Sequence, residues 1–439
     1  MNNFKKFIYI VPLITILTGC GSAFDALPRQ GNNEPLPKYG LISEDDFLKV
    51  TGKKVHTVGD ESKNVMLEGI NVGGLFFIEQ WMSPVTPNER VGQWDQKKFT
   101  ETIFNRFGEE KSLKYWETYR NYYWTEDDYI QCKKMGMSVL RLPFNYMTVD
   151  PEFHMVRKIE GQKYNFELLD KFIDGAGRHG LYVILDLHGA YGSHNGQDHS
   201  GEIIADAKDV DFYYNEEKMQ KTIDLWDAIS KRYINNPIVA AYDLLNEPGE
   251  KAGSTTTRHF KFMDRCYDAI RANNDNHIIM FESCWGVGNL PNPTTYEWTN
   301  CIYQLHHYSW TNDLASHKTF VDNKMNEINS STHNVPYYIG EFFCQKNALS
   351  WDYTLKSYKE NNLHFTPWTY KVVGDASTSG GTSIYVTTGG KFDPDTATYE
   401  EMLNNFYTLQ TFHKKNRPST LEGGTMIGYL LAHYMGGEF

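Results

Sequence analysis

Two glutamates, Glu247 and Glu341, end apolar segments that are typical of buried strands. They stand in Ala241-Tyr-Asp-Leu-Leu-Asn-Glu-Pro248 and Tyr337-Tyr-Ile-Gly-Glu-Phe-Phe343. A carboxylate in such a place cannot enter an apolar core without a large cost in free energy. A pair of them at the mouth of a barrel has the chemistry of glycoside hydrolysis. Ordinary ion pairs are the alternative for either glutamate taken alone.

Eight short apolar segments without polar alternation are typical of parallel strands that are buried on both faces. They are residues 65–71, 138–143, 182–187, 239–245, 277–282, 301–305, 336–340 and 364–368. A hairpin is predicted ahead of them in residues 47–58, closing the bottom of the barrel.

Helical periodicity lies between the predicted strands. One such stripe is Met219, Ile223, Trp226 and Ile229, and another is Phe260, Met263, Tyr267 and Ile270. Strand–helix alternation through eight units predicts an α/β fold, a (β/α)8 TIM barrel, as a single catalytic domain over residues 46–439. Its last helix is expected in residues 398–413. A doubly wound sheet is less consistent with the sequence, because residues 69–74 lack the glycine spacing of a nucleotide loop.

Polar or aromatic side chains stand at or just after the C-terminal ends of six predicted strands, where barrel enzymes place their active sites. They are Arg141, His188, Asn246, Glu247, His306, Tyr308, Glu341 and Trp368. Glu247 and Glu341 belong to strands four and seven, which face each other across an eight-stranded barrel. This topology permits the separation of about 5–5.5 Å at which retaining glycosidases hold their carboxyl groups.

The expected neighbours give the two glutamates different roles. Arg141 beside Glu341 would keep that carboxylate ionised, as a nucleophile must be. Glu247 would be the general acid and base, which needs a raised pKa.

Three further side chains are expected to assist the two glutamates. Asn246 would bond the sugar 2-hydroxyl, and Tyr308 would donate a hydrogen bond to Glu341. Trp368 would offer a flat face beneath the sugar.

With these residues in place, residues 67–371 resemble the cellulase family, which is family five of the glycoside hydrolases in clan A. The family's recurring strand-end residues fall, by resemblance, on the eight residues given above, and Leu244-Leu-Asn-Glu-Pro248 is the specific part. The resemblance implies Glu247 as acid/base, Glu341 as nucleophile, retention of configuration, and neither metal nor other cofactor.

Residues 186–201 are similar to a loop of fungal exo-β-1,3-glucanases in this family, as are residues 69–74 with Glu79 and Trp81. Tyr191 departs from the pattern, since those enzymes usually have Pro there. The similarity implies a β-1,3-glucan or mixed β-glucan as substrate. A β-mannan, a β-1,6-glucan, a glycolipid, or a non-catalytic sugar-binding lipoprotein are the alternatives.

Several other polar and aromatic residues have two interpretations. His188, His194, Asp198 and His199 match no common metal spacing and are expected in a polar cleft loop. His307 should point behind the sheet, since neighbours on a strand face opposite ways. Glu282 is either a partner of the site or a cleft wall. Sugar stacking and packing are equally open for Tyr191, Trp285 and Trp310.

The first residues have the pattern of an export signal. Lys5 and Lys6 precede an apolar stretch, residues 7–17, that is too short to span a bilayer. It ends in Leu17-Thr-Gly-Cys20, which resembles the bacterial lipobox. Residues 1–19 are therefore predicted to be a lipoprotein signal peptide and Cys20 the lipidated residue, with residues 20–45 as a flexible tether. The resemblance implies an exported protein anchored to a bacterial membrane only through this lipid.

The composition of the 439 residues narrows the class of partner. A net charge of −12 disfavours nucleic acid and favours a neutral polysaccharide or oligosaccharide. Aromatic residues, at 15% of the chain, suit a cleft with flat walls. Five cysteines remain besides Cys20, with no CxxC pair, so a zinc site is not expected and most should be buried thiols.

Overall fold

The computed structural model describes residues 40–85, 94–249, 257–283, 286–345, 347–373, 384–387, 391–407, 409 and 424–439. All of these residues belong to one compact unit of the chain, Pro35–Phe439. The predicted signal peptide, Cys20 and the tether up to residue 39 lie outside the described residues.

The tether was predicted to extend to residue 45, but residues 40–45 are part of the folded unit. Ile42 is buried in the main core, and the Leu41 amide donates to the Gly177 carbonyl at 2.8 Å. Residues 40–45 therefore belong to the folded unit, because the apolar side chain of Ile42 is covered by the barrel.

The strands are β1 (Leu48–Thr51), β2 (Lys54–Thr57), β3 (Gly69–Asn71), β4 (Val139–Asn145), β5 (Tyr182–Gly189), β6 (Val239–Asp243), β7 (Ile278–Glu282), β8 (Cys301–Tyr308), β9 (Tyr337–Phe343), β10 (His364–Phe365), β11 (Lys371–Val373) and β12 (Tyr385–Thr387). The α-helices are α1 (Gln96–Tyr123), α2 (Glu126–Lys134), α3 (Glu167–Arg178), α4 (Glu216–Tyr233), α5 (Thr257–Ala272), α6 (Leu314–Asn329), α7 (Ala348–Glu360), α8 (Tyr399–Phe406) and α9 (Gly424–Met435).

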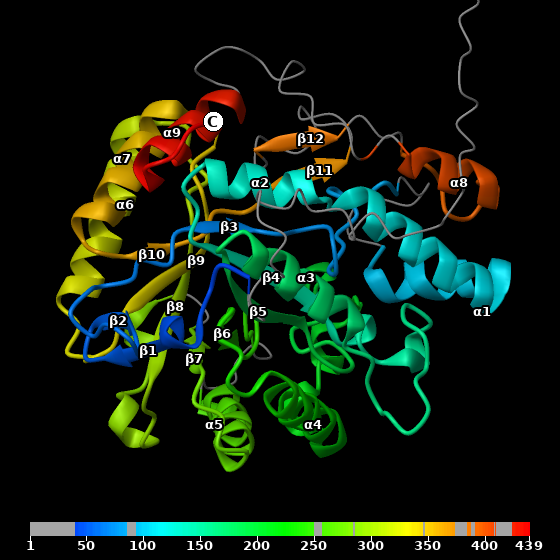
Figure 1. Cartoon of the computed structure of the whole chain (residues 1–439), viewed down its shortest axis with the longest axis horizontal. Coiled ribbons are helices and arrows are strands. Elements are labelled where there is room, and N and C mark those ends of the chain that lie inside the picture. The colour runs from blue at the N-terminus through cyan, green and yellow to red at the C-terminus, as the bar shows by residue number, and fades with distance from the viewer. Residues whose placement is uncertain are drawn as a thin grey trace, which may run out of the picture. The chain divides into compact units, whose positions relative to one another are not determined.

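Strands β3 to β10 form one parallel eight-stranded sheet in chain order. A parallel bridge between Glu68 and Phe365 brings the last strand back to the first, and the Phe365 amide donates to the Leu67 carbonyl at 2.9 Å. The predicted (β/α)8 barrel is therefore confirmed, with all eight predicted strands in place (Figure 1).

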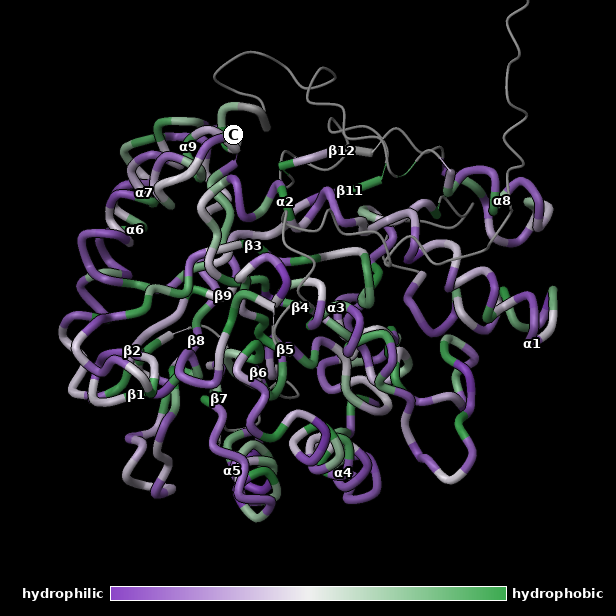
Figure 2. The backbone as a smooth tube through the Cα atoms, in the orientation of Figure 1, coloured by the Kyte–Doolittle hydropathy of each residue, from purple (hydrophilic) through white to green (hydrophobic). Residues whose placement is uncertain are grey.

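The strands of the barrel are buried along almost their whole length, which explains why they lack polar alternation. Figure 2 shows hydrophobic backbone gathered at β4, β5 and β6, with more hydrophilic stretches on the outer helices α4 and α5. The predicted hairpin is β1 and β2, and its Leu48 and Val55 pack with interior residues such as Ile184. Each such buried side chain contributes about 1.5–3 kcal/mol. The hairpin lies at the N-terminal ends of the strands, since the Val50 amide donates to Oδ1 of Asn300, directly before β8, at 2.7 Å.

Two predicted helices differ from the structure. The described part of the connection from β7 to β8 holds only two 3-10 turns, Val287–Asn289 and Pro293–Thr295, so one of the eight units has no α-helix. Residues 399–406 do form α8, but α8 packs against α1, whereas α9 packs against α7 (Figure 1). The place of the last barrel helix therefore belongs to α9, since it lies beside the neighbouring barrel helix α7.

The described cysteines are Cys132, Cys266, Cys301 and Cys344, and all four are buried free thiols, as predicted. Cys284 lies outside the described residues. Within the described part of the chain, no helix combines the length and the apolar character that crossing a membrane requires.

Candidate active site

The eight predicted site residues converge at the C-terminal ends of the strands. One carboxylate oxygen from Glu247, one from Glu341 and a ring nitrogen of His306 all lie within 4.8 Å of one another. The other members join this centre through contacts: Arg141 and Tyr308 touch Glu341, and Arg141 also touches Asn246.

Arg141 is fully buried at the centre of β4, and it has an acceptor for each of its five N–H groups. The acceptors, all within 3.1 Å, are Asn71 Oδ1, Asp186 Oδ2, Asp243 Oδ2, Asn246 Oδ1 and Glu341 Oε1. Burial raises the pKa of Asp186 to about 7 and that of Asp243 to about 6, although the Arg141 charge acts the other way. One permanent cation thus holds three buried carboxyl groups together.

Glu341 is held from both sides. Its Oε1 accepts from Arg141 Nη1 at 2.8 Å, and its Oε2 accepts from the Tyr308 hydroxyl at 2.6 Å. Strands β8 and β9 approach closely just before it, since a Cβ at Gly340 would lie 2.6 Å from the Gln304 side chain. The predicted contacts of Glu341 with Arg141 and Tyr308 are present.

Glu247 follows β6 in an unusual backbone conformation. Its φ is 42°, in the left-handed region that non-glycine residues seldom adopt. Two buried or partly buried side chains hold this peptide: Glu282 Oε2 accepts from the Glu247 amide at 3.0 Å, and Asn195 Nδ2 donates to the Glu247 carbonyl at 3.1 Å. The fold therefore fixes the direction of the Glu247 side chain, and Glu282 is a partner of the site rather than a cleft wall.

His306 lies between three glutamates. Its Nδ1 is 2.9 Å from Glu247 Oε1 and 3.6 Å from Glu341 Oε2, and its Nε2 is 3.5 Å from Glu282 Oε1. Burial lowers the pKa of His306, but the surrounding carboxylates outweigh burial and raise it to about 10. His306 is therefore a cation at neutral pH.

The same cation acts on both glutamates of the pair. Burial raises the pKa of Glu341, but the charges of His306 and Arg141 outweigh it and leave the pKa below its usual value. The hydrogen bond and charge of His306 likewise lower the pKa of Glu247 against the effect of burial. The expectation of a raised pKa at Glu247 is wrong for the free site, because a protonated histidine lies beside it.

A metal ion fits this cluster poorly. The three atoms within 4.8 Å have the spacing of a metal site. However, a protonated imidazole has no lone pair to offer a metal, and His306 keeps its proton up to a pKa of about 10.

One side of the site is formed by three side chains in contact, those of His188, Asn246 and Trp368. The His188 Nδ1 lies 2.7 Å from Asp186 Oδ2, and Asn246 Nδ2 donates to His188 Nε2 at 3.3 Å. Burial lowers the pKa of His188 well below its usual value, so its ring is neutral. Trp368 stacks on this ring with centroids 5.2 Å apart and planes 15° apart. The tryptophan is thus held against the ring of His188, which is in turn bonded to Asn246.

Glu79 and Trp81, from the loop after β3, also belong to this region. The Trp81 indole donates to Glu79 Oε2 at 2.9 Å. Burial raises the pKa of Glu79 well above its usual value, and the carboxylates of Asp198, Glu341 and Glu247 raise it further. A protonated Glu79 can donate a hydrogen bond to a hydroxyl group.

Four residues of the site are absent from the eight strand-end residues predicted for it. They are Asn71, Asp186, Asp243 and His199, the last of which was predicted only to lie in a polar cleft loop. Asn71 ends the first strand of the barrel, and Asp186 and Asp243 interrupt apolar strands, so a search for polar residues in buried strands would find all three. His199 lies 3.0 Å from Glu247 Oε2, and only the path of its loop brings it there.

The structure also shows where the other residues with two interpretations lie, as far as it describes them. His307 points behind the sheet, as predicted, with Nδ1 2.7 Å from the Tyr358 hydroxyl. Tyr191 is buried and bonded to Asp150, so it packs. Trp310 is 77% exposed and stacks on Tyr308 with planes 13° apart. Trp285 lies outside the described residues.

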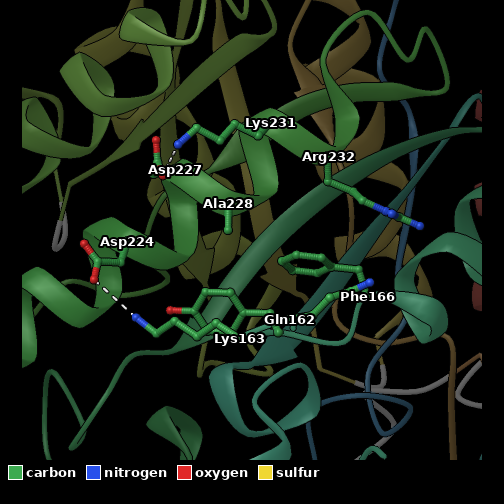
Figure 3. Close-up of a pocket in the computed structure, with 9 residues that line it drawn as sticks. Gln162, Lys163, Phe166, Asp224, Asp227, Ala228, Lys231 and Arg232 are labelled. Atoms are coloured by element: carbon green, nitrogen blue, oxygen red, sulfur yellow. Dashed lines mark hydrogen bonds and ion pairs between the residues drawn. The ribbon is translucent and has the colours of Figure 1, made fainter. Parts of the chain in front are cut away.

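A separate hollow of about 530 Å³ lies between helix α4 and residues 162–166 (Figure 3). Its charged side chains are already paired, with Lys163 3.2 Å from Asp224 and Lys231 2.7 Å from Asp227. It contains none of the strand-end residues, so it is distinct from the carboxylate pair.

The fold and the site together define a (β/α)8 barrel with a carboxylate pair at the C-terminal mouth. Residues 95–373, more than half of the chain, match the family model of Cellulase (glycosyl hydrolase family 5), and the chain belongs to this family.

Two named relatives are similar to part of the chain. A beta-xylosidase of Phanerodontia chrysosporium is 30% identical over 266 residues, which are 60% of this chain and 52% of that protein. A probable glucan 1,3-beta-glucosidase A of Aspergillus fumigatus is 30% identical over 250 residues, which are 56% of each chain. The chain thus spans about half of the length of these relatives.

Solved structures share the fold. An endogalactoceramidase has a TM-score of 0.54 at 16% identity, with 82% of this chain and 84% of that chain covered. A rutinosidase from Aspergillus niger has a TM-score of 0.51 at 17% identity, with 78% and 98% covered. At such low identity these likenesses show the barrel architecture alone.

Proposed function

We propose that the protein is a retaining glycoside hydrolase that cleaves β-glucosidic bonds in a β-glucan by double displacement. The observation that carries the proposal is the approach of Glu247 and Glu341, with carboxylate oxygens within 4.8 Å. Retaining enzymes hold these groups about 5–5.5 Å apart, whereas inverting enzymes leave about 6.5–9.5 Å for a water molecule. The arrangement supports direct attack by a carboxylate.

In the first step, a Glu341 oxygen attacks the anomeric carbon while the bond to the leaving oxygen breaks. Glu247 gives its proton to that oxygen, so the leaving group departs as an alcohol. Arg141 and Tyr308 favour the ionised form of Glu341 before the attack, since both donate to its oxygens.

In the second step, Glu247 takes a proton from water, and the water oxygen displaces Glu341 from the anomeric carbon. The configuration is thereby retained after two inversions. Asn246 Oδ1 is engaged by Arg141, which directs the Asn246 amide nitrogen toward His188 and the wall beside Trp368. A sugar 2-hydroxyl can accept from this nitrogen, a contact that strengthens in the transition state.

A β-glucan is the substrate class best supported by the chain. The named relatives include a glucan 1,3-beta-glucosidase, and the net charge of −12 suits a neutral polymer. The beta-xylosidase relative favours a β-xyloside as the second candidate. A non-catalytic sugar-binding protein would have no use for the carboxylate pair.

A substrate panel with covalent trapping tests the proposal. Laminarin, lichenan, cellulose, pustulan, mannan, aryl β-xylosides and glucosylceramide would be compared, with products resolved by chromatography. A 2-deoxy-2-fluoroglycosyl fluoride should label the peptide that contains Glu341, as seen by mass spectrometry. Glu360→Gln, on an exposed helix position of α7, is the matched control and should be labelled like wild type. A label on any other carboxylate would contradict the assignment.

We also propose that the protein is exported and anchored to a bacterial membrane by lipid on Cys20. The basic residues, the apolar stretch and the sequence Leu17-Thr-Gly-Cys20 support this. Radiolabelled palmitate should enter the full chain in cells and should not enter Cys20→Ala. Equal labelling of the two chains, or of neither, would contradict the anchor.

A further inference from the structure

Two buried polar side chains lie next to the backbone of the carboxylate pair, Glu282 at the end of β7 and Gln304 in β8. They are paired in the register of the two strands, and Gln304 Nε2 donates to Glu282 Oε2 at 2.9 Å. Both residues are 0% exposed, so neither can touch a sugar in the site. Any effect that they have on the reaction must therefore pass through the residues that they contact.

Glu282 holds the acid/base residue by its main chain. Its Oε2 accepts from the Glu247 amide at 3.0 Å, in addition to the bond from Gln304. The left-handed conformation of Glu247, with a φ of 42°, is strained for a residue other than glycine and persists only where neighbouring groups hold it. Because the backbone conformation determines where the side chain points, this hydrogen bond helps to direct the Glu247 carboxyl group.

Gln304 lies against the backbone that carries the other glutamate. A Cβ at Gly340, directly before Glu341, would lie only 2.6 Å from the Gln304 side chain. The Gly340 carbonyl also accepts from Asn71 Nδ2 at 2.8 Å and from the Thr366 hydroxyl at 2.7 Å. The backbone at Gly340 is thus held between the Gln304 side chain and these two hydrogen bonds.

These contacts make one continuous path between the two glutamates. It runs from the Glu247 amide through Glu282 and Gln304 to Gly340. We propose that Glu282 and Gln304 form a buried positioning pair that sets the separation of the two carboxyl groups. This inference rests on the proposed double displacement, in which both carboxyl groups act on one glycosidic bond.

The path crosses four consecutive strands of the sheet. Glu247 follows β6, Glu282 ends β7, Gln304 belongs to β8 and Gly340 to β9. A retaining enzyme needs its carboxyl groups about 5–5.5 Å apart. A displacement of about 1 Å caused by a substitution away from the reacting atoms can lower the rate about 100-fold. A buried pair that links the four strands can therefore control the rate without touching the substrate.

An effect of charge on His306 is the alternative role for Glu282. Glu282 Oε1 lies 3.5 Å from His306 Nε2 and makes no hydrogen bond among the described residues. A carboxamide at position 282 would keep an acceptor oxygen for the Glu247 amide but would carry no charge. Glu282→Gln therefore separates the positioning role from the effect of charge.

The test compares leaving groups. Aryl β-glycosides of the sugar selected by the substrate panel would be prepared with 2,4-dinitrophenol, which leaves without a proton, and with phenol, which needs one. In Glu282→Leu, kcat/KM for the phenyl glycoside should fall about 100-fold, mostly through kcat. It should fall less for the dinitrophenyl glycoside, because a displaced acid matters less there. Glu282→Gln should recover most of the loss.

Gln304→Leu tests whether the two residues act as a unit. It removes the N–H that Glu282 accepts and should show the same dependence on the leaving group, also where Glu282→Leu does not fold. The double variant should be no slower than Glu282→Leu, because the path is already broken. Independent contributions would multiply instead, and that result would overturn the pair.

Asp275→Leu is the matched control, just before the other end of β7. Asp275 is also 0% exposed, and its Oδ1 accepts from a main-chain amide, that of His277, at 2.9 Å. The variant should lower the free energy of unfolding, as Glu282→Leu does, but should leave the ratio of the two kcat/KM values unchanged. The same change of this ratio in both variants would overturn the positioning role, because lost stability alone would explain it.

The outcomes separate this inference from the proposed function. Glu247→Gln should lose far more activity on the phenyl than on the dinitrophenyl glycoside, and if it does not, the acid/base role itself is wrong. If Glu247→Gln behaves as expected while Glu282→Leu slows both glycosides equally or neither, only the positioning pair is overturned. A Glu282→Gln variant as slow as Glu282→Leu would overturn it as well, since charge would then be the cause.

Discussion

Glu341 is held by Arg141 and Tyr308, both from the strands of the barrel, whereas Glu247 lies against His306 from the barrel and His199 from the loop after β5. The surroundings of Glu341 are closed, since its side chain is 6% exposed and Arg141 is fully buried. Glu247 is 19% exposed, and a loop forms part of its surroundings.

The contrast follows from what each carboxyl group would do. A nucleophile needs one charge state throughout, and a guanidinium provides it because it stays protonated. An acid/base must gain and lose a proton in each cycle, and Glu247 is accordingly the more exposed of the two glutamates. The site therefore combines a fixed, closed half at β9 with a more open half at β6.

Azide would separate the two halves with the largest effect. Glu341→Ala and Glu247→Ala should each lower kcat on a natural glucan by about 10⁴-fold or more. Azide should then give an α-glycosyl azide with Glu341→Ala, because it replaces the nucleophile in a single displacement. It should give a β-glycosyl azide with Glu247→Ala, because it attacks the glycosyl enzyme.

The anomeric configuration of each azide product is measured by NMR. The same product from both variants would abolish the distinction between the two glutamates. Glu360→Gln should behave like wild type in the same assay.

Arg141→Met would break the fixed half. It leaves Asp186, Asp243 and Glu341 without their cation, and it should lower the free energy of unfolding by about 3–5 kcal/mol. Urea denaturation followed by circular dichroism measures this. Arg232→Met removes an exposed arginine that pairs with Asp170, and it should cost less than about 1 kcal/mol. Equal losses in the two variants would show that burial of the Arg141 network contributes nothing.

His306→Gln would remove the cation shared by both halves. The folded pKa of His306, about 10, is above its unfolded value of 6.5, so its contribution to stability is complete below pH 6.5 and is lost as pH rises toward 10. Wild type should therefore exceed His306→Gln by a few kcal/mol at pH 6, since one pKa unit is about 1.4 kcal/mol.

Urea unfolding at several pH values measures the difference between wild type and His306→Gln. The difference should shrink steadily between pH 6.5 and 10. A constant difference over this range would mean that His306 is neutral in the folded protein.

Tyr308→Phe would weaken the fixed half by one hydrogen bond. A hydrogen bond to a charged group contributes about 1.5–3 kcal/mol, so kcat/KM should fall roughly 10–100-fold. The loss favours protonated Glu341 and raises its pKa, so the acidic limb of the pH profile should move to higher pH. The profile of kcat/KM measures this. A shift of the basic limb instead would place the effect on Glu247.

The strand-end residues were predictable because a polar group in a buried strand conflicts with its surroundings wherever it occurs. That conflict alone selected Glu247, Glu341 and Arg141, and the repeated spacing of apolar segments indicated the barrel. The missing helix between β7 and β8 was not predictable from that spacing, because the strand count stays the same when a helix is replaced by turns.

The pKa of Glu247 was predicted in the wrong direction for a related reason. The sequence places His306 on a different strand, 59 residues away, and does not show that its Nδ1 reaches Glu247. Hydrogen bonds of this kind depend on strand register and rotamers, which apolar periodicity does not specify. The same holds for Asn195 and His199.

The sequence by itself determined the barrel and the two glutamates at its mouth, because burial constrains the pattern of apolar and polar residues along the chain. Only the tertiary structure decided how each glutamate is held. Arg141 gathers three carboxyl groups at one end of the barrel, while the loop after β5 brings His199 to the oxygen of Glu247 that His306 leaves free. These contacts join residues that are far apart in the chain, and their electrostatic effect depends on distances of a few ångströms.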